Sequence, residues 1–181
     1  RRQRQMCIRD RLSAARAGDG WAFDELFRTW NAPVTGFVRA RGVLDVGGVV
    51  NDVFLRAFGA IGSFDGDESG FRAWLFTIAR NRVIDEARRN SRTPATTHLD
   101  AASTFAGGDV VADAERRFGD DRLVALLGLL TDEQREVLTL RIVADLTIDQ
   151  IAEATGRRRG AVKQLQRRAL RRLERALEGE E

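Results

Sequence analysis

Apolar residues recur at helical spacing in two stretches of this chain, and a polar stretch separates them. In the first stretch, apolar side chains return every three or four residues, which predicts three helices. Asp19 is placed to cap the first helix, and Pro33 predicts a break or kink in it. We interpret 42–48 and 63–70 as the intervening loops. The apolar positions are Trp21, Phe23, Leu26, Phe27 and Trp30; Val49, Val50, Val53, Phe54, Ala57, Phe58 and Ile61; and Phe71, Trp74, Leu75, Ile78, Ala79, Val83 and Ile84.

The second stretch predicts a helix-turn-helix motif. Thr131 and Thr147 each stand three residues before a glutamine, the spacing of a capping box, so each is expected to open a helix. Gly156 fits the left-handed residue that ends the second of these helices. A long basic helix then runs from about residue 160 to 177. The expected buried positions are Val137, Leu138, Leu140 and Ile142 after Thr131, and Val162, Leu165, Ala169 and Leu173 in the last helix.

Between the two stretches, residues 90–109 are rich in Pro, Thr, Ser and Gly and keep no apolar period. The sequence therefore predicts an all-α chain of two small helical domains, 12–91 and 117–178, joined by an acidic flexible linker, 92–116. The C-terminal domain is the helix-turn-helix. Residues 1–11 resemble the translation of a sequencing-library adapter, so we interpret them as a non-native stretch and leave them out of the fold.

Composition narrows the class of protein. A single cysteine excludes an intramolecular disulfide, and a single histidine, His98 in the linker, excludes the usual histidine-centred triads and most metal clusters. Two prolines, no tyrosine and few β-branched runs argue against a sandwich or barrel. No apolar run is long enough to cross a bilayer. We expect a cytoplasmic protein without membrane insertion, without a bound metal or cofactor and without catalytic residues. The sequence has no paired carboxylates flanked by a nucleophile, no phosphate-binding glycine loop and no metal-ligand spacing.

Charge is concentrated more than the net value of +3 suggests. Residues 97–133 hold three arginines and eight acidic residues, whereas 157–175 hold nine basic residues and one acid, Glu174. A polyanionic partner is therefore expected at one short segment and not over the whole surface.

Two segments carry residues suited to nucleic acid. In the last helix the buried stripe leaves Arg159, Lys163, Gln164, Arg167, Arg168 and Arg171 on outward faces. Arginine can pair with guanine or phosphate, and glutamine with adenine; a solvated basic helix in an ordinary bundle is the alternative. In 71–89, aromatic residues alternate with arginines, which suits single-stranded DNA. There we interpret Trp74, Leu75 and Ile78 as core. Periodicity alone does not distinguish two interpretations of Phe64, Arg80, Asn81 and Arg88: they are simply exposed to solvent, or they contact nucleic acid.

Three stretches together resemble an extracytoplasmic-function (ECF) sigma factor of the bacterial sigma-70 family. The segment A-G-D-x-x-A-F-D-E-L-F, from Ala17 to Phe27, resembles the start of region 2. D-V-F-L-R-A-F and F-R-A-W-L-F-T-I-A-R-N resemble its centre and end. L-T-x-x-Q-R-E-V-L-x-L, T-I-D-Q-I-A-E-A-T-G and G-A-V-K-Q-L-Q-R-R-A-L-R-R-L resemble region 4. The resemblance covers about 12–91 and 117–177.

The resemblance implies a non-enzymatic transcription initiation factor and its partners. Region 2 is expected to bind the clamp coiled coil of the largest subunit of core RNA polymerase and to capture an unstacked base of the −10 element. Region 4 is expected to read the −35 element as duplex, and an anti-sigma factor is an expected partner. The implied polymerase contacts are Asn51, Asp52, Phe54 and Arg56. The −10 contacts are Phe64, Arg80, Asn81 and Arg88, and the −35 contacts are the six outward residues of the last helix.

The sequence departs from the family pattern before its second helix. Gly47 and Gly48 stand where relatives carry other residues, and two adjacent glycines weaken a helix start by about 1 kcal/mol each relative to alanine. Two alternatives therefore remain: a degenerate sigma-like protein with weakened polymerase binding, and a helix-turn-helix regulator that works without polymerase. Binding to core polymerase separates them from a sigma factor.

Overall fold

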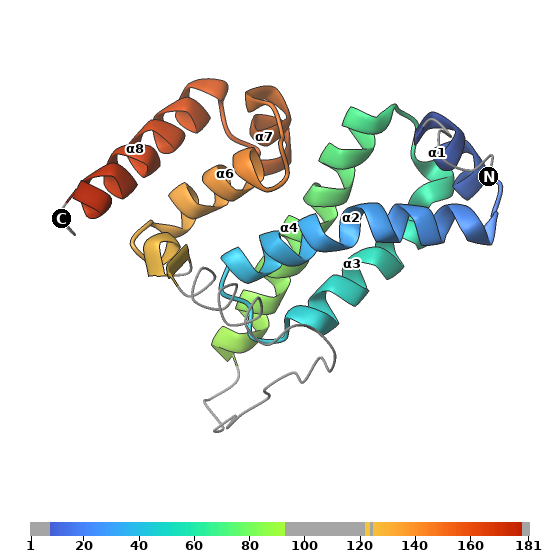
Figure 1. Cartoon of the computed structure of the whole chain (residues 1–181), viewed down its shortest axis with the longest axis horizontal. Helices are drawn as coiled ribbons and strands as arrows, with labels where there is room; N and C mark the ends of the chain where they lie inside the picture. The colour runs from blue at the N-terminus through green and yellow to red at the C-terminus, as the bar shows by residue number, and fades with distance from the viewer. Residues whose placement is uncertain (1–7, 93–121, 124, 179–181) are drawn as a thin grey trace, which may run out of the picture.

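The computed structural model describes residues 8–92, 122–123 and 125–178, and every regular element in these residues is a helix. Figure 1 shows two groups of helices, α1 to α4 and α6 to α8, lying side by side. Residues 122–123 and 125–128 are also helical. The helices are α1 (Ile8–Arg16), α2 (Gly20–Ala40), α3 (Val46–Ala60), the 3-10 turn η1 (Ile61–Ser63), α4 (Glu68–Arg92), α6 (Asp132–Ile142), α7 (Ile148–Thr155) and α8 (Arg159–Glu178). The all-α prediction is confirmed.

The first group packs an aromatic core between α2, α3 and α4. Phe37 and Phe76 are fully buried and meet edge to face, with ring centroids 5.6 Å apart. Helix α1 lies against α2 and η1, and it buries Leu12 and Ala15. The sequence analysis did not predict α1, which begins inside the stretch set aside as non-native, although the three-residue spacing of Leu12 and Ala15 is the helical signal for it.

Three element boundaries differ from the prediction. Helix α2 continues through Pro33 to Ala40 and is not broken there. Helix α3 begins at Val46, because the carboxylate of Asp45 caps it by accepting a 2.9 Å hydrogen bond from the Gly48 amide. Residues 47 and 48 are therefore in the first helical turn and not in a loop. Asp67 caps α4 in the same way and starts that helix at Glu68, inside the predicted 63–70 loop.

The second group has the predicted helix-turn-helix. Both capping boxes are present, at Thr131 with Gln134 and at Thr147 with Gln150. Gly156 adopts a left-handed φ of 67° and ends α7. Helix α8 buries Val162 and Ala169 completely. Ile142, the last residue of α6, departs from the expected stripe, since it is 64% exposed.

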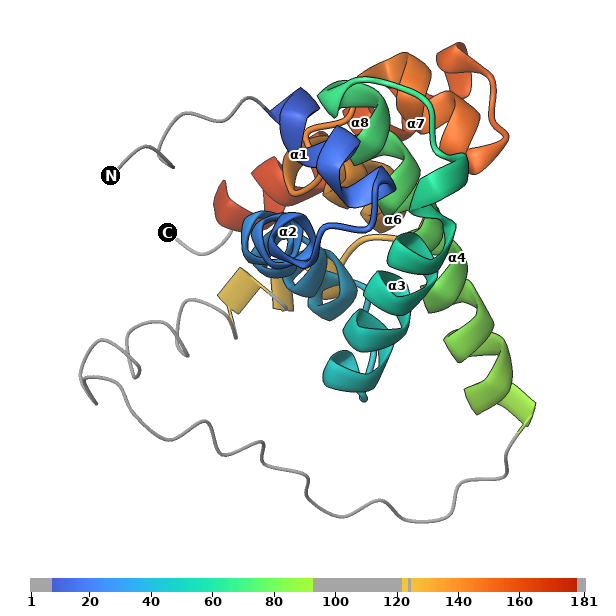
Figure 2. The same ribbon diagram turned by 90° about the vertical axis from the view of Figure 1, so that its right-hand side faces the viewer.

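The two groups share one hydrophobic core instead of standing apart. Leu140, Leu146 and Ile151 are fully buried in the same cluster as Phe37 and Phe76. Helix α6 contacts α2, and α7 contacts α4. Figure 2, turned by 90°, shows α6 and α7 lying against α2 and α4 from this direction as well. We call this packing of α6 and α7 on α2 and α4 the closed arrangement.

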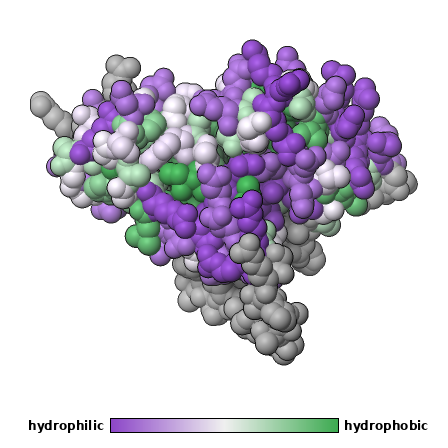
Figure 3. Space-filling model, turned by 180° about the vertical axis from the view of Figure 1, so that it is seen from behind, coloured by the Kyte–Doolittle hydropathy of each residue, from purple (hydrophilic) through white to green (hydrophobic). Residues whose placement is uncertain are grey.

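The surface is mostly hydrophilic on the face drawn in Figure 3, with apolar residues in small groups between polar ones. None of the described helices combines the length and the apolar character needed to cross a membrane. Likewise, no three His, Cys, Asp or Glu side chains among residues 8–92, 122–123 and 125–178 are grouped to hold a metal ion.

Candidate nucleic-acid interface

Helix α8 presents its predicted basic face to solvent. All six residues expected to meet duplex DNA are exposed, while Val162 and Ala169 on the opposite side are fully buried. Arg159 forms an ion pair with Asp149 of α7. Within the part of the chain that the structure describes, Lys163, Arg167 and Arg168 make no ion pair, so their charges are directed to solvent. These six residues are Arg159, Lys163, Gln164, Arg167, Arg168 and Arg171.

A second candidate surface runs along α4. Trp74, Asn81 and Arg88 follow one another at intervals of seven residues, which places them on one face of the helix at steps of about 10 Å. Asn81 and Arg88 are exposed and Trp74 is half-buried. The ring of Phe64 packs on Trp74, with centroids 5.1 Å apart at 34°. Phe64 therefore contacts this face of α4 through Trp74, which the sequence analysis interpreted as a core residue only. The seven-residue spacing of Trp74 and Asn81 could have indicated that the two share a face.

The ring of Phe64 is partly covered, so it is not fully accessible for stacking with a base. The guanidinium carbon of Arg16 lies over its ring at 5.5 Å, and a Cβ added to Gly66 would approach its ring to 2.8 Å. The same Arg16 side chain lies 3.7 Å from the carboxylate of Asp65. Helix α1 thus helps to hold the loop that carries Phe64, and a base reaching this ring would have to move Arg16.

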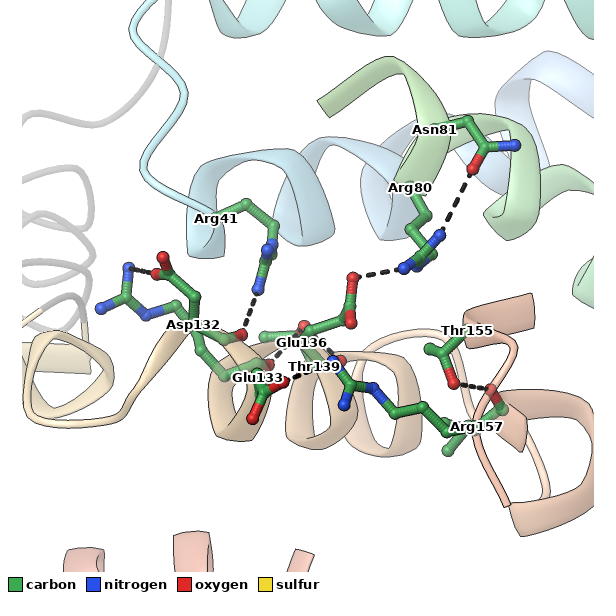
Figure 4. Close-up of polar contacts among 11 residues, drawn as sticks. Arg41, Arg80, Asn81, Asp132, Glu133, Glu136, Thr139, Thr155 and Arg157 are labelled. Carbon is green, nitrogen blue, oxygen red and sulfur yellow. Dashed lines mark hydrogen bonds and ion pairs between the residues drawn. The ribbon is translucent and has the colours of Figure 1, made fainter. Parts of the chain in front are cut away.

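Arg80 is not exposed in the closed arrangement. Its Nε donates a 2.9 Å hydrogen bond to Oε1 of Glu136, a buried carboxylate of α6, and its Nη1 donates to Oδ1 of Asn81 at 3.4 Å (Figure 4). The predicted −10 residues are therefore divided: Asn81 and Arg88 face solvent, whereas Arg80 faces α6. Any contact of Arg80 with DNA requires that the pair with Glu136 separate.

The residues expected to bind polymerase lie on α3 with unequal exposure. Asn51 and Arg56 are exposed, and the Asp52 carboxylate accepts a 2.7 Å hydrogen bond from Nε of the buried Arg82. Phe54 is only 3% exposed and packs on Phe27 and Phe58, so its side chain offers no contact surface.

The neighbouring Leu55 is instead 63% exposed, and it lies one helical turn after Asn51. On the part of α3 that is predicted to bind polymerase, Leu55 and not Phe54 therefore presents an apolar side chain to solvent. Periodicity could have indicated this, because position 55 falls outside the buried stripe of α3.

Comparison with known proteins gives the family. Residues 26–93 match the family model of Sigma-70 region 2, and residues 126–175 match that of Sigma-70, region 4. The ECF RNA polymerase sigma factor BldN of Streptomyces coelicolor is 31% identical over 185 residues, which cover 92% of this chain and 64% of BldN. The ECF RNA polymerase sigma factor SigD of Mycobacterium tuberculosis is 33% identical over 174 residues, which cover 90% of this chain and 80% of SigD.

A solved structure of CnrH in complex with the cytosolic domain of CnrY is similar over 96% of this chain and 99% of that chain, with a TM-score of 0.71 and 26% identity. Together with the two matched regions, these relatives show that the chain belongs to the ECF sigma factors of the sigma-70 family. It is accordingly a transcription initiation factor and not an enzyme. Region 2 corresponds to α2–α4 and region 4 to α6–α8.

Proposed function

We propose that this sigma factor binds core RNA polymerase through α3, captures a base of the −10 element beside α4 and reads the −35 element with α8. The exposed basic face of α8, opposite a fully buried stripe, is the observation that carries this proposal. A helix-turn-helix places its second helix in the major groove, where arginine and glutamine distinguish base pairs. Lys163, Gln164, Arg167 and Arg168 are the proposed base-reading residues.

The polymerase contact is proposed for Leu55 with Asn51 and Arg56 around it. The intact start of α3 supports it, because Asp45 caps the helix at Gly48 and the two glycines do not unwind it. This favours a working sigma factor over a degenerate one. Asp52 belongs to the proposed surface as well, but its carboxylate is also tied to Arg82 inside region 2. A charge reversal at Asp52 would therefore disturb the fold as well as the contact.

A regulatory protein partner of the anti-sigma kind is also proposed. The likeness to CnrH, solved with the cytosolic domain of CnrY, supports it, since that likeness extends over nearly the whole described chain. Such a partner is expected to compete with core polymerase for the chain, and a competition titration with the purified partner measures this directly.

Transcription in vitro tests the proposal. The full chain is mixed with bacterial core polymerase and a library of random promoters, and the transcripts are mapped. We expect initiation from templates that share two motifs, at about −10 and −35. Transcripts identical to those of core polymerase alone would reject the sigma function, and duplex binding without any effect on polymerase would favour the polymerase-independent regulator.

A further inference from the structure

Arg16 of α1 reaches the loop that carries Phe64. Its guanidinium carbon lies over the Phe64 ring at 5.5 Å, its Nη2 donates to the Gly66 carbonyl at 3.5 Å, and the same Nη2 lies 3.7 Å from Oδ1 of Asp65. A single side chain thus contacts three consecutive residues of this loop. Arg16 precedes residues 26–93, the part of the chain that matches region 2, so the matched region does not include it.

The backbone that carries Arg16 is held in place. Arg16 is the last residue of α1, and Leu12 and Ala15 of the same helix are buried. Gly18 adopts a left-handed φ of 89°, and the Asp19 amide donates back to a carbonyl of α1 at 3.0 Å, which closes the end of the helix. Figure 1 shows α1 beside η1, the turn that leads into the loop. The fold therefore fixes where the Arg16 side chain starts.

The other neighbours of the Phe64 ring belong to α4. Phe71 meets the ring edge on, with centroids 5.6 Å apart, and Trp74 packs on it at 5.1 Å. Phe71 is 1% exposed, so it cannot move without opening the core. The Arg16 side chain is 32% exposed and can move toward solvent. A base that stacks on Phe64 would therefore displace Arg16 and leave the two aromatic residues in place.

The contacts of Arg16 are weak enough to be exchanged for a base. Its distances to Gly66 and Asp65 are long for a hydrogen bond and an ion pair, and Asp65 is fully exposed to water. A cation over an aromatic ring at an exposed site is worth less than a base stacked on that ring. The exchange is therefore favourable, and the displaced guanidinium stays near the ring because Asp65 and Gly66 remain within its reach.

The displaced guanidinium would offer hydrogen-bond donors to the base. Among the residues that the structure describes, Nε and Nη1 of Arg16 have no acceptor. Arginine donates only, and a charged donor pairs most strongly with a carbonyl or anionic oxygen. Guanine, cytosine and thymine each carry a carbonyl oxygen, whereas adenine offers only ring nitrogens beside an amino group. An arginine at this place therefore favours the three bases that have a carbonyl over adenine.

We propose that Arg16 is a specificity-determining residue for the base that region 2 captures. Its guanidinium covers the ring of Phe64 in the free protein, yields the ring to the base, and then donates to a carbonyl oxygen of that base. Arg16 acts here on the captured base of the −10 element, so its role rests on the proposed function. Helix α1 thereby contributes to the choice of promoter, together with the loop and α4.

Binding to a promoter that is already open tests this role. Holoenzyme made from the full chain and core polymerase is titrated onto a labelled promoter whose −10 region is a bubble of mismatched bases. An abasic site is moved through the open strand, and the position where it weakens binding most is the captured base. That position then receives each of the four bases in turn, and fluorescence anisotropy gives the Kd of each template.

Two variants of Arg16 and one matched control are compared with wild type. Arg16→Ala removes the donors, and Arg16→Met removes them but keeps an unbranched apolar side chain that can cover Phe64. Arg28→Ala is the control, because it makes the same change of net charge and Arg28 pairs with Glu25 inside α2. Circular dichroism first confirms equal helicity, and a titration confirms equal affinity for core polymerase.

The expected result is a change of base preference. For wild type and Arg28→Ala, the most tightly bound carbonyl-bearing base should exceed adenine in affinity at least about fivefold. In both Arg16 variants this ratio should fall at least about threefold, because the carbonyl-bearing bases bind more weakly while adenine is little affected. A lower ratio in wild type, a smaller fall in either variant, or an equal loss for all four bases would overturn the role of Arg16.

The abasic scan separates failure of this role from failure of the proposed function. If no abasic position weakens binding, region 2 captures no base, and both the capture and the role of Arg16 are wrong. If one position is sensitive but the Arg16 variants keep the wild-type base preference, the capture stands and only the role of Arg16 is wrong.

Discussion

Arg82 links α3 to α4 at the centre of region 2. Its side chain is 5% exposed, and it donates to Asp52 at 2.7 Å and to Glu86 at 2.9 Å. Burial works to lower the pKa of Arg82, but the hydrogen bonds to the two carboxylates outweigh it and raise that pKa. In turn, the hydrogen bond from Arg82 holds the pKa of Asp52 below its ordinary value. The pair is thus fully charged at neutral pH.

This pair predicts an acid-dependent loss of stability. A carboxyl group whose pKa is lower in the folded state stabilises the fold above its unfolded pKa, about 3.9 for aspartate, and loses that effect as the pH falls through the folded value. Asp52→Asn should therefore be less stable than wild type at pH 7 and should approach it below about pH 4. Urea unfolding at a series of pH values measures this. A gap that stays constant down to pH 3 would contradict the role of the Asp52 charge.

Replacing Gly47 or Gly48 of α3 by alanine is predicted to change the free energy of unfolding in opposite directions. A Cβ at Gly48 would lie 2.2 Å from Oδ2 of Asp45, whereas nothing lies within 4 Å of a Cβ at Gly47. Gly47→Ala should raise the free energy of unfolding by up to about 1 kcal/mol through helix propensity. Gly48→Ala should lower it by up to about 1 kcal/mol, because loss of an N-cap costs about 0.5–2 kcal/mol. Urea unfolding of both variants compares them, and equal stabilisation would show that the cap is unimportant.

Among the elements, α8 is the one proposed to read the −35 element. Arg168 is a proposed base contact and Arg171 a proposed phosphate contact, and both are exposed. In holoenzyme, Arg168→Ala should cost about 1–3 kcal/mol and relax preference at one base pair. Arg171→Ala should weaken all sequences alike and lower the salt slope by about one unit. A promoter-variant panel at several salt concentrations measures both; the same uniform loss for the two variants would leave α8 as an electrostatic anchor only.

Helix α4 makes a prediction about melting. Extruding a base costs a few kcal/mol, and the proposed contacts beside Phe64 and Asn81 would offset this cost. Asn81→Ala should leave duplex binding by region 4 intact but reduce opening of the promoter. Permanganate footprints of the holoenzyme measure opening, with duplex affinity as the internal control. A bubble identical to that of wild type would contradict the assignment of Asn81.

The elements were largely predictable because their signals are local. Capping boxes, the glycine after α7 and the stripe of Val162 and Ala169 are all read within a few residues of sequence, and the structure confirms them. The path of α2 through Pro33 was not predictable in this way, since packing of Val34 and Phe37 overrides a local break.

At the scale of the whole molecule, the closed arrangement lay beyond sequence reasoning. The pairs that hold it join residues far apart in the chain: Arg72 and Asp145 are 73 residues apart, and Arg80 and Glu136 are 56 apart. No local sequence pattern predicts such a pair, so Arg80 was expected to contact DNA and its pair with Glu136 was not foreseen. The exposed basic face of α8 was predictable, because helical periodicity determines it without any partner.

Polymerase binding is the measurement that tests the sigma function most directly. Labelled full chain is titrated with core RNA polymerase as wild type, as Leu55→Asp on α3 and as Leu177→Asp near the end of α8. Both leucines are exposed, at 63% and 45%, so neither change disturbs the core. We predict tight binding for wild type and Leu177→Asp, and at least about a tenfold loss for Leu55→Asp, because an apolar contact of one leucine is worth about 1.5–3 kcal/mol. Failure of wild type to bind polymerase would contradict the sigma function, and equal binding of all three would contradict the contact through α3.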